Sequence, residues 1–169
     1  MTAGYLGLGS NLGDRRENLE RAARALSEER ELRVLASSSV YETDPVGEIT
    51  DQPAFLNACL RIETDLDPEA LLDLCQDIER RLGRSPGPRH APRTADIDVL
   101  LLGERSHESP RLRIPHPALL ERRFVLIPLL ELDFGARTPG GAALADALAG
   151  IAPAGQDVRL AGPPLVGPG

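Results

Sequence analysis

The segment FLNACLRIET at residues 55–64 alternates between two kinds of side chain, and this alternation constrains the fold most strongly. Successive side chains of a β-strand point to opposite faces of a sheet. One face receives Leu56, Ala58, Leu60 and Ile62, and the other receives Phe55, Asn57, Cys59 and Arg61. The first set predicts a core face. On the second face, Phe55 is either an aromatic available to stack on a flat ring or a side chain packed beneath a loop.

Two amphipathic helices are predicted on either side of this strand in the chain. The first begins after Asp14, a suitable N-cap, and runs to about Glu29; the second begins at Asp67-Pro68 and ends at Gly83. Apolar residues recur at helical spacing in both helices, namely Leu19, Ala22, Ala23 and Leu26 in the first and Leu71, Leu74, Cys75, Ile78 and Leu82 in the second. Each helix therefore has one face to bury against a sheet.

Further strands are predicted at residues 5–8, 32–41 and 95–102, which gives the order β-α-β-β-α-β. That order is typical of the ferredoxin-like α+β arrangement, a largely antiparallel sheet. We expect the helices on one face of the sheet and the active site on the other. Residues 1–161 are expected to form one domain with a short helix near 142–149, and residues 162–169, rich in Gly and Pro, a disordered tail.

The run RTADIDVLLLG at 93–103 places two carboxylates at the start of an apolar strand. Asp96 and Asp98 are two residues apart, so both point to the same face. Strict alternation would put Ile97, Val99 and Leu101 on the opposite face, and Leu100 and Leu102 on the same face as the aspartates. Paired carboxylates suit Mg²⁺, which keeps positions open for water and substrate phosphates. The alternative is a solvated strand end.

The segment GRSPGPRHAPR at 83–93 joins the second helix to this strand. Its prolines and glycines exclude a helix. Arg84, Arg89 and Arg93 are suited to phosphate, because a guanidinium group binds it through a planar fork. We interpret the segment as a lid that closes over an anion, with a solvated basic loop as the alternative.

The composition removes several classes of function. The net charge of −7 argues against non-specific nucleic-acid binding, and no apolar stretch is long enough to span a membrane. With no secretory signal pattern, a cytoplasmic protein is expected. Every basic side chain is arginine, so a P-loop lysine is excluded, and the pattern G-x-G-x-x-x-G at 7–13 is too long for a dinucleotide fingerprint. Cys59 and Cys75 are interpreted as core thiols.

Six segments together carry a resemblance to a known family. They are GLGSNLGDR at 7–15, YETDP at 41–45, QPAFLNACLRIET at 52–64, LLDLCQDIERRLGR at 71–84, PRTADIDVLLLG at 92–103 and IPHPALLERRFVLIPLLEL at 114–132. In this order and spacing they resemble the 6-hydroxymethyl-7,8-dihydropterin pyrophosphokinases of folate biosynthesis. The resemblance implies transfer of a pyrophosphoryl group from ATP to the pterin hydroxymethyl oxygen, with AMP as the second product.

The resemblance also implies roles for individual residues. Asp96 and Asp98 match the pair that holds two Mg²⁺ ions, and Asp96 also counts among the substrate-binding positions. The remaining pterin positions are Thr43, Val46, Phe55, Asn57 and Phe124, where the two phenylalanines sandwich the ring. The ATP positions are Gln76, Glu79, Arg84, Arg93, Val99, His116 and Arg122. Arg84, Arg89 and Arg93 join the two aspartates as the catalytic set. His90 and Pro117 depart from the family, which often has aromatic residues there.

Two other functions are compatible with the same residues. A two-metal phosphohydrolase would use Asp96 and Asp98 on a phosphodiester and would not need the phenylalanines. A non-catalytic ferredoxin-like binding module would leave the aspartates as a solvated strand end. The expected partners are small molecules, ATP and the pterin, with neither nucleic acid nor membrane, and a monomer is expected.

Overall fold

A computed structural model of the chain describes residues 1–44, 53–83 and 94–166. Its elements are β1 (Thr2–Ser10), α1 (Arg15–Ser27), β2 (Leu32–Ser37), β3 (Val40–Thr43), β4 (Phe55–Thr64), α2 (Pro68–Arg81), β5 (Asp96–Leu102), β6 (His107–Glu108), β7 (Arg113–Ile114), α3 (Arg123–Leu132), α4 (Leu144–Ala149) and β8 (Val158–Gly162). The order β-α-β-β-α-β predicted from the sequence is confirmed, except that the predicted strand at 32–41 is divided into β2 and β3.

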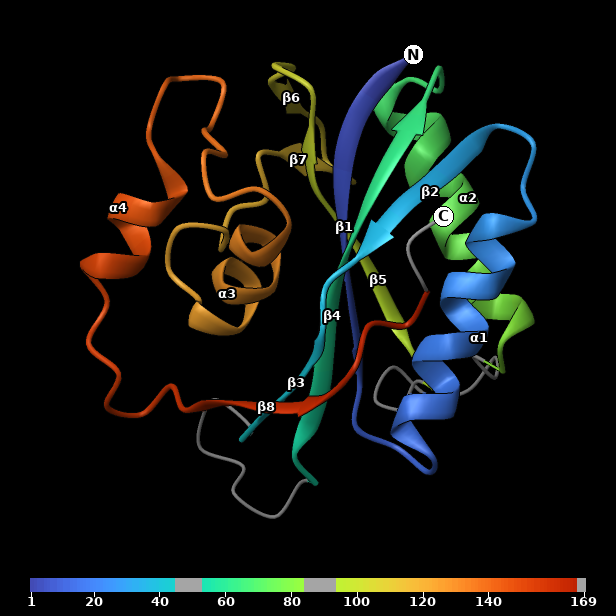
Figure 1. Cartoon of the computed structure of the whole chain (residues 1–169). Coiled ribbons are helices and arrows are strands. Elements are labelled where there is room, and N and C mark those ends of the chain that lie inside the picture. The colour runs from blue at the N-terminus through green and yellow to red at the C-terminus, as the bar shows by residue number, and fades with distance from the viewer. Residues whose placement is uncertain (45–52, 84–93, 167–169) are drawn as a thin grey trace.

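The main sheet is antiparallel, with the strand order β5-β1-β4-β3-β8, and β2 also pairs with β4 (Figure 1). The two central strands run side by side in register from Thr2 opposite Thr64 to Ser10 opposite Leu56. The predicted strand at 32–41 is interrupted, because β2 ends at Ser37 and β3 begins at Val40. As a result, one end of β4 pairs with β2 and the other end pairs with β3.

The predicted starts of α1 and α2 are confirmed by their caps. The Asp14 side chain accepts a hydrogen bond from the Glu17 N–H, and the Asp67 side chain accepts one from the Ala70 N–H. Each bond satisfies an N–H that a helix start leaves without an intrahelical partner. Both helices bury the predicted apolar stripes against the Leu56, Ala58, Leu60 and Ile62 face of β4, in one core cluster.

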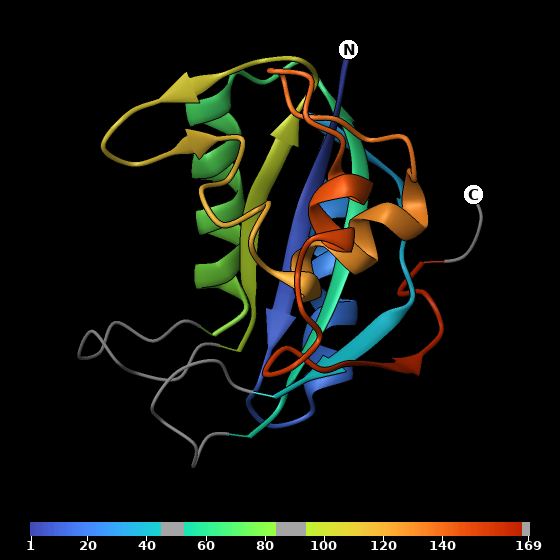
Figure 2. The ribbon, with the colours of Figure 1, turned by 90° about the vertical axis from the view of Figure 1, so that its left-hand side faces the viewer.

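The second face of the sheet carries α3 and α4, which lie in front of it in Figure 2 while α1 lies behind. Cys59 of β4 packs on this side with Leu126 and Leu129 of α3 and Leu144 of α4. The expectation that this face is left entirely to a site therefore needs refinement. Helices cover one part of it, and the site described below occupies another part.

The direction of side chains along β5 differs from strict alternation. Tyr5 of β1 pairs with Leu101, and Leu6 pairs with Val99, so Leu100 is an extra residue in β5. A bulge of this kind reverses the alternation beyond it. Ile97, Val99 and Leu102 consequently pack in the core of α1 and α2, whereas Leu100 and Leu101 pack on the α3 side. The placement of Leu101 and Leu102 expected from alternation was wrong.

The C-terminal residues also differ from expectation over 162–166, which do not form a free tail. Gly162 ends β8, the strand that pairs with β3. The Leu165 N–H donates to Ser37 Oγ at 3.0 Å, and the Leu165 and Val166 side chains pack against the α1 and α2 core. Arg16 of α1 also donates to the Pro163 and Pro164 carbonyls, and together these contacts hold the segment against the domain. Residues 167–169 lie outside the described ranges.

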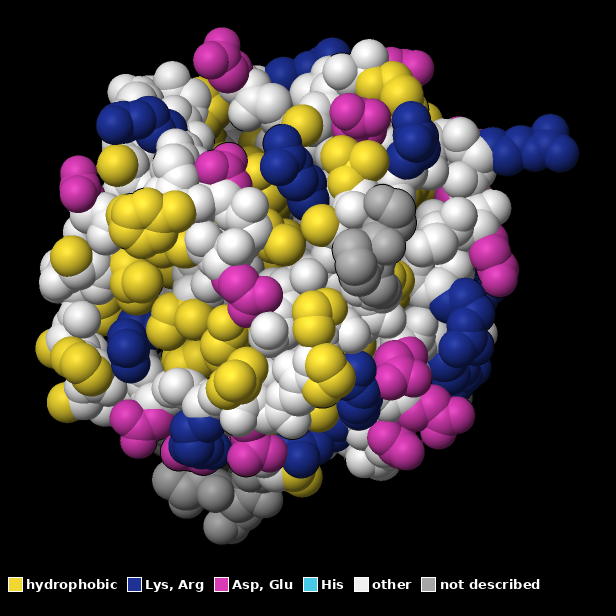
Figure 3. Space-filling model, viewed as in Figure 1, with side chains coloured by type: hydrophobic (Ala, Val, Ile, Leu, Met, Phe, Trp, Pro, Cys, Tyr) yellow, Lys and Arg dark blue, Asp and Glu magenta, His cyan; other side chains and the backbone are white. Residues whose placement is uncertain are grey.

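Both cysteines are buried free thiols, as the sequence predicts. Burial raises the pKa of Cys75 to about 12 and that of Cys59 well above its ordinary value. Among the residues that the structure describes, no helix is both long and apolar enough to cross a membrane. On the face shown in Figure 3, arginine side chains are interspersed with acidic ones.

Candidate active site

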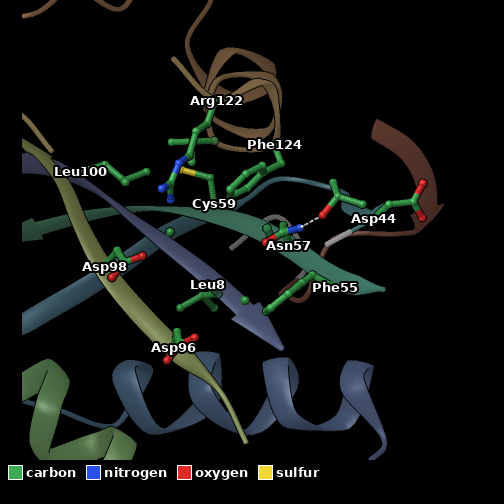
Figure 4. Close-up of a pocket in the computed structure, with 15 residues that line it drawn as sticks. Leu8, Asp44, Phe55, Asn57, Cys59, Asp96, Asp98, Leu100, Arg122 and Phe124 are labelled. Atoms are coloured by element: carbon green, nitrogen blue, oxygen red, sulfur yellow. Dashed lines mark hydrogen bonds between the residues drawn. The ribbon is translucent and has the colours of Figure 1, made fainter. Parts of the chain in front are cut away.

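A pocket of about 320 Å³ opens where β1, β3, β4 and β5 meet the start of α3. The described residues among those predicted for one flat substrate all line it. Phe55 and Phe124 lie on opposite sides of the pocket, with Asn57 between them (Figure 4). Phe55 and Asn57 reach it because alternation directs both toward the face of β4 away from α1 and α2. Two facing rings with a polar group between them suit a flat heterocycle.

The floor of this pocket contains two glycines of β1, Gly7 and Gly9. A Cβ atom at Gly9 would lie 3.2 Å from Asn57 Oδ1, and one at Gly7 would lie 3.4 Å from a methyl group of Leu100. A side chain at Gly9 would therefore press on the Asn57 amide, whereas one at Gly7 would only touch Leu100. The glycine-rich run that fails as a dinucleotide fingerprint thus leaves room on the sheet surface for a ligand.

The Asn57 amide is held by Thr43, the last residue of β3. Asn57 Nδ2 donates to Thr43 Oγ1 at 2.8 Å, and both side chains are buried. This bond fixes which way the amide points. Because the amide group is planar, the same hydrogen bond also fixes the direction of its oxygen and of its second N–H. The protein can thereby present a fixed donor and acceptor pattern to the edge of a ring.

Arg122 lies at the same pocket, immediately before α3. Its guanidinium carbon is 5.6 Å from the centre of the Phe124 ring, within the range of a cation–π contact. The resemblance assigned Arg122 to ATP. In the structure it lies beside the ring pocket, with its charge on the side of Asp98 (Figure 4).

A second pocket of about 430 Å³ adjoins the first and lies between α2, β5 and the segment of 109–117. Four of the residues predicted for ATP line it, namely Gln76, Glu79, Val99 and His116. Arg111 and Arg113 line it as well. Arg111 forms an ion pair with Asp73 and donates to Gln76 Oε1 at 3.3 Å, which holds this segment against α2.

The surroundings of His116 in this pocket favour its neutral form. Burial lowers its pKa; the Asp98 carboxylate opposes this effect and the Arg122 guanidinium adds to it. His116 Nδ1 accepts a hydrogen bond from the Ala118 N–H at 3.1 Å, so the neutral ring carries its proton on Nε2. A neutral imidazole with Nε2–H is a hydrogen-bond donor for a phosphate oxygen.

Asp96 and Asp98 stand where the two pockets meet. Both line the first pocket, and Asp98 also lines the second. The described residues include no group of three or more His, Cys, Asp or Glu side chains placed to hold a metal ion. A pair of carboxylates still fits Mg²⁺, because this ion is usually bound by one or two carboxylates together with substrate phosphates and water.

Four of the predicted site residues lie outside the described ranges. They are Val46, Arg84, Arg89 and Arg93. The lid interpretation of 83–93 therefore stays a prediction.

Sequence reasoning did not select Arg111 and Arg113. The sequence does alternate between charged and apolar residues at Arg111-Leu112-Arg113. In the structure both arginines are exposed and Leu112 is buried. The short hairpin of β6 and β7 that displays them has only two residues in each strand, too few for periodicity to reveal.

The fold and the two pockets define a class of protein. It is a ferredoxin-like α+β protein with two adjoining pockets, one lined by two phenylalanines and the other by two arginines and a histidine, and with a pair of aspartates at their junction. A family model described as 7,8-dihydro-6-hydroxymethylpterin-pyrophosphokinase (HPPK) matches residues 5–134. The chain belongs to this family of enzymes.

Individual relatives agree with this assignment. A 2-amino-4-hydroxy-6-hydroxymethyldihydropteridine pyrophosphokinase of Bacillus subtilis is 48% identical over 128 residues, covering 76% of each chain. A protein of the same name from Methylorubrum extorquens is 44% identical over 155 residues, covering 92% of this chain and 97% of the relative. A crystal structure of Plasmodium falciparum HPPK-DHPS superposes with a TM-score of 0.69 at 15% identity. That alignment covers 88% of this chain and 45% of the other, so this chain spans less than half of that protein; the likeness shows the fold.

Proposed function

We propose that this chain transfers pyrophosphate from ATP to the hydroxymethyl group of 6-hydroxymethyl-7,8-dihydropterin in folate biosynthesis. The hydroxymethyl oxygen of the pterin attacks the β-phosphorus of ATP and releases its proton to solvent, the bond from that phosphorus to the bridging oxygen of the α-phosphate breaks, and AMP leaves. The family supports this reaction. The observation that carries it here is the position of Asp98, which lines both the ring pocket and the second pocket.

The first pocket is the pterin site in this proposal. Phe55 and Phe124 bind the two faces of the ring, and the Asn57 amide, oriented by Thr43, pairs with its polar edge. The stacking directs the hydroxymethyl group toward Asp96 and Asp98. Val46 completes the site as a predicted contact.

The second pocket is the ATP site. Gln76, Glu79 and Val99 form one wall, and Arg111, Arg113 and His116 contribute the cationic or donating groups. Asp96 and Asp98 would hold Mg²⁺, and the bound ion would neutralise part of the phosphate charge. The arginines act in the same direction, because charge is the main obstacle to attack on a polyphosphate.

The protein chiefly positions its two substrates. Holding the pterin oxygen and the β-phosphorus together converts a bimolecular reaction into a unimolecular one. Arg89 and Arg93 are proposed to reach the phosphates when the segment 83–93 closes, which makes their effect greatest on the chemical step. Single-turnover rates of Arg89→Ala and Arg93→Ala test this: unchanged rates with both substrates bound would contradict a catalytic lid.

The proposed reaction is tested by measuring AMP formation from ATP with and without the pterin. AMP that appears only when pterin and Mg²⁺ are both present supports the transferase. Release of phosphate without pterin would favour the two-metal phosphohydrolase. Nucleotide binding that is independent of Mg²⁺, without turnover, would favour a binding module.

A further inference from the structure

The start of α3 carries two residues of the ring pocket but lacks a capping side chain of its own. Arg122 is the N-cap residue, and its side chain makes no capping hydrogen bond. Within α3, Pro128 has no N–H to donate to the Phe124 carbonyl, the bond that an α-helix would make there. The first turn, from which Arg122 and Phe124 reach the pocket, is closed by hydrogen bonds from the Val125 and Leu126 N–H groups to the Arg122 carbonyl, but it has no capping side chain of its own.

Gln156, far along the chain, supplies that support. Its Oε1 accepts a hydrogen bond from the Arg123 backbone N–H at 3.0 Å, and its Nε2 donates to the Glu121 carbonyl at 3.3 Å. Its own carbonyl accepts from Arg123 Nη1 at 2.8 Å. One side-chain amide thus binds the backbone on both sides of Arg122 and fills the role that a capping side chain would have.

The segment that holds Gln156 is itself fixed to the opposite side of the pocket. Two residues later, Val158 begins β8, and it pairs with Thr43 of β3. Thr43 lines the ring pocket and orients Asn57. Residues 156–158 therefore connect the α3 side of the pocket to the β3 side. This segment lies beyond residues 5–134, the part that matches the family model.

We propose that Gln156 is a positioning residue for the ring pocket: its amide fixes the start of α3, and thereby the positions of Phe124 and Arg122 relative to the sheet. Gln156 is not among the residues that line the pocket, so it acts through the residues that it holds. The inference rests on the proposed function for the identity of the ring, the pterin.

The substitution Gln156→Ala tests the proposal. It removes both side-chain hydrogen bonds and leaves the lining of both pockets unchanged. We expect the KM and the calorimetric dissociation constant for the pterin to rise by roughly tenfold, the effect of one or two lost hydrogen bonds. The KM for ATP should change less than about twofold. Gln156→Glu keeps the acceptor for the Arg123 N–H but places a carboxylate oxygen against the Glu121 carbonyl, so its pterin KM should also rise above that of wild type.

Thr64→Val is the matched control for general destabilisation. Thr64 Oγ1 also makes two hydrogen bonds to the backbone, donating to the Glu31 carbonyl at 2.6 Å and accepting from the Leu66 N–H at 3.0 Å. Thr64 is the last residue of β4, whereas Phe55, which lines the ring pocket, is the first. This variant should lose stability without changing the ratio of the two KM values.

The outcomes separate the two proposals. If Gln156→Ala and Gln156→Glu change the pterin and ATP constants equally, or no more than Thr64→Val does, Gln156 is only a structural residue. If wild type forms no AMP but binds the pterin and Gln156→Ala weakens that binding, the proposed function fails and the positioning role stands. If wild type does not bind the pterin, both fail.

Discussion

Replacing Thr43 with valine should weaken pterin binding although it removes no group from contact with the ring faces. Valine has nearly the shape of threonine, so the change creates no cavity, but it deletes the acceptor of the 2.8 Å bond from Asn57 Nδ2. The Asn57 side chain is buried, with 7% of its surface exposed. Its N–H must then remain unpaired or turn toward the pocket.

The size of the effect follows from this geometry. A buried donor left without a partner costs about 1–3 kcal/mol, so the melting temperature should fall by several degrees. When the amide turns toward the pocket to recover a partner, it must turn back for the pterin. We expect this reorientation to weaken pterin binding by about 1 kcal/mol, roughly fivefold, with ATP binding unchanged.

Calorimetric titration with the pterin in the presence of a non-hydrolysable ATP analogue measures the effect. Thr43→Ser is the matched control, because it keeps the hydroxyl and loses only a methyl group. Equal pterin affinities for Thr43→Val and Thr43→Ser would refute the orienting role of Thr43. A double-mutant cycle with Asn57→Ala should further show that the two substitutions are not additive.

Three other predictions concern the pockets and the tyrosines. Phe55→Ala and Phe124→Ala should each weaken pterin binding by about 1–3 kcal/mol, through lost stacking and apolar contact, and leave ATP binding unchanged; unaltered pterin titrations for both would contradict the sandwich. Asp98→Asn should lower the rate of AMP formation by at least about a hundredfold while the melting temperature stays near that of wild type, and near-normal turnover would remove this residue from the proposed metal site. Burial, followed by the hydrogen bonds to Asp133 and Glu131, raises the pKa of Tyr5 and Tyr41 to about 12. The folded state therefore holds these protons more tightly, and the stability that they contribute is present below pH 10 and lost as the pH rises toward 12. An absorbance titration that shows either tyrosine ionising near pH 10 in the native protein would contradict this.

The sequence predicted the central part of the fold because its signals are local. The alternation of 55–64 and the capping residues Asp14 and Asp67 each act within a few residues, and all three appear as expected. The gathering of Phe55, Asn57 and Phe124 followed only from the family resemblance, because Phe124 lies on a different element, far along the chain.

Features that depend on contacts between distant residues could not be predicted. The bulge at Leu100 arises from how β5 pairs with β1, and no residue of β5 signals it by type. The packing of Leu165 against Ser37 and the core lies in a run of Gly and Pro whose composition indicates disorder. Gln156 lies 33 positions from Arg123, beyond the reach of any motif.

The bulge in β5 adds one residue, Leu100, to the strand without a partner in β1. Before Leu100, the side chains of Asp96 and Asp98 point toward the pockets. After Leu100, Leu101 packs on the α3 side and Leu102 packs in the core of α1 and α2, the reverse of what strict alternation would give. Deleting Leu100 would make the pairing of β5 with β1 regular, because Val99 and Leu101 already pair with the adjacent residues Leu6 and Tyr5. Asp96 and Asp98 would keep their direction toward the pocket, and Leu101 and Leu102 would stay in their present cores. The loss would be the Leu100 side chain, which is buried on the α3 side and lines the ring pocket, so the extra residue serves the pocket wall and not the register of the strand.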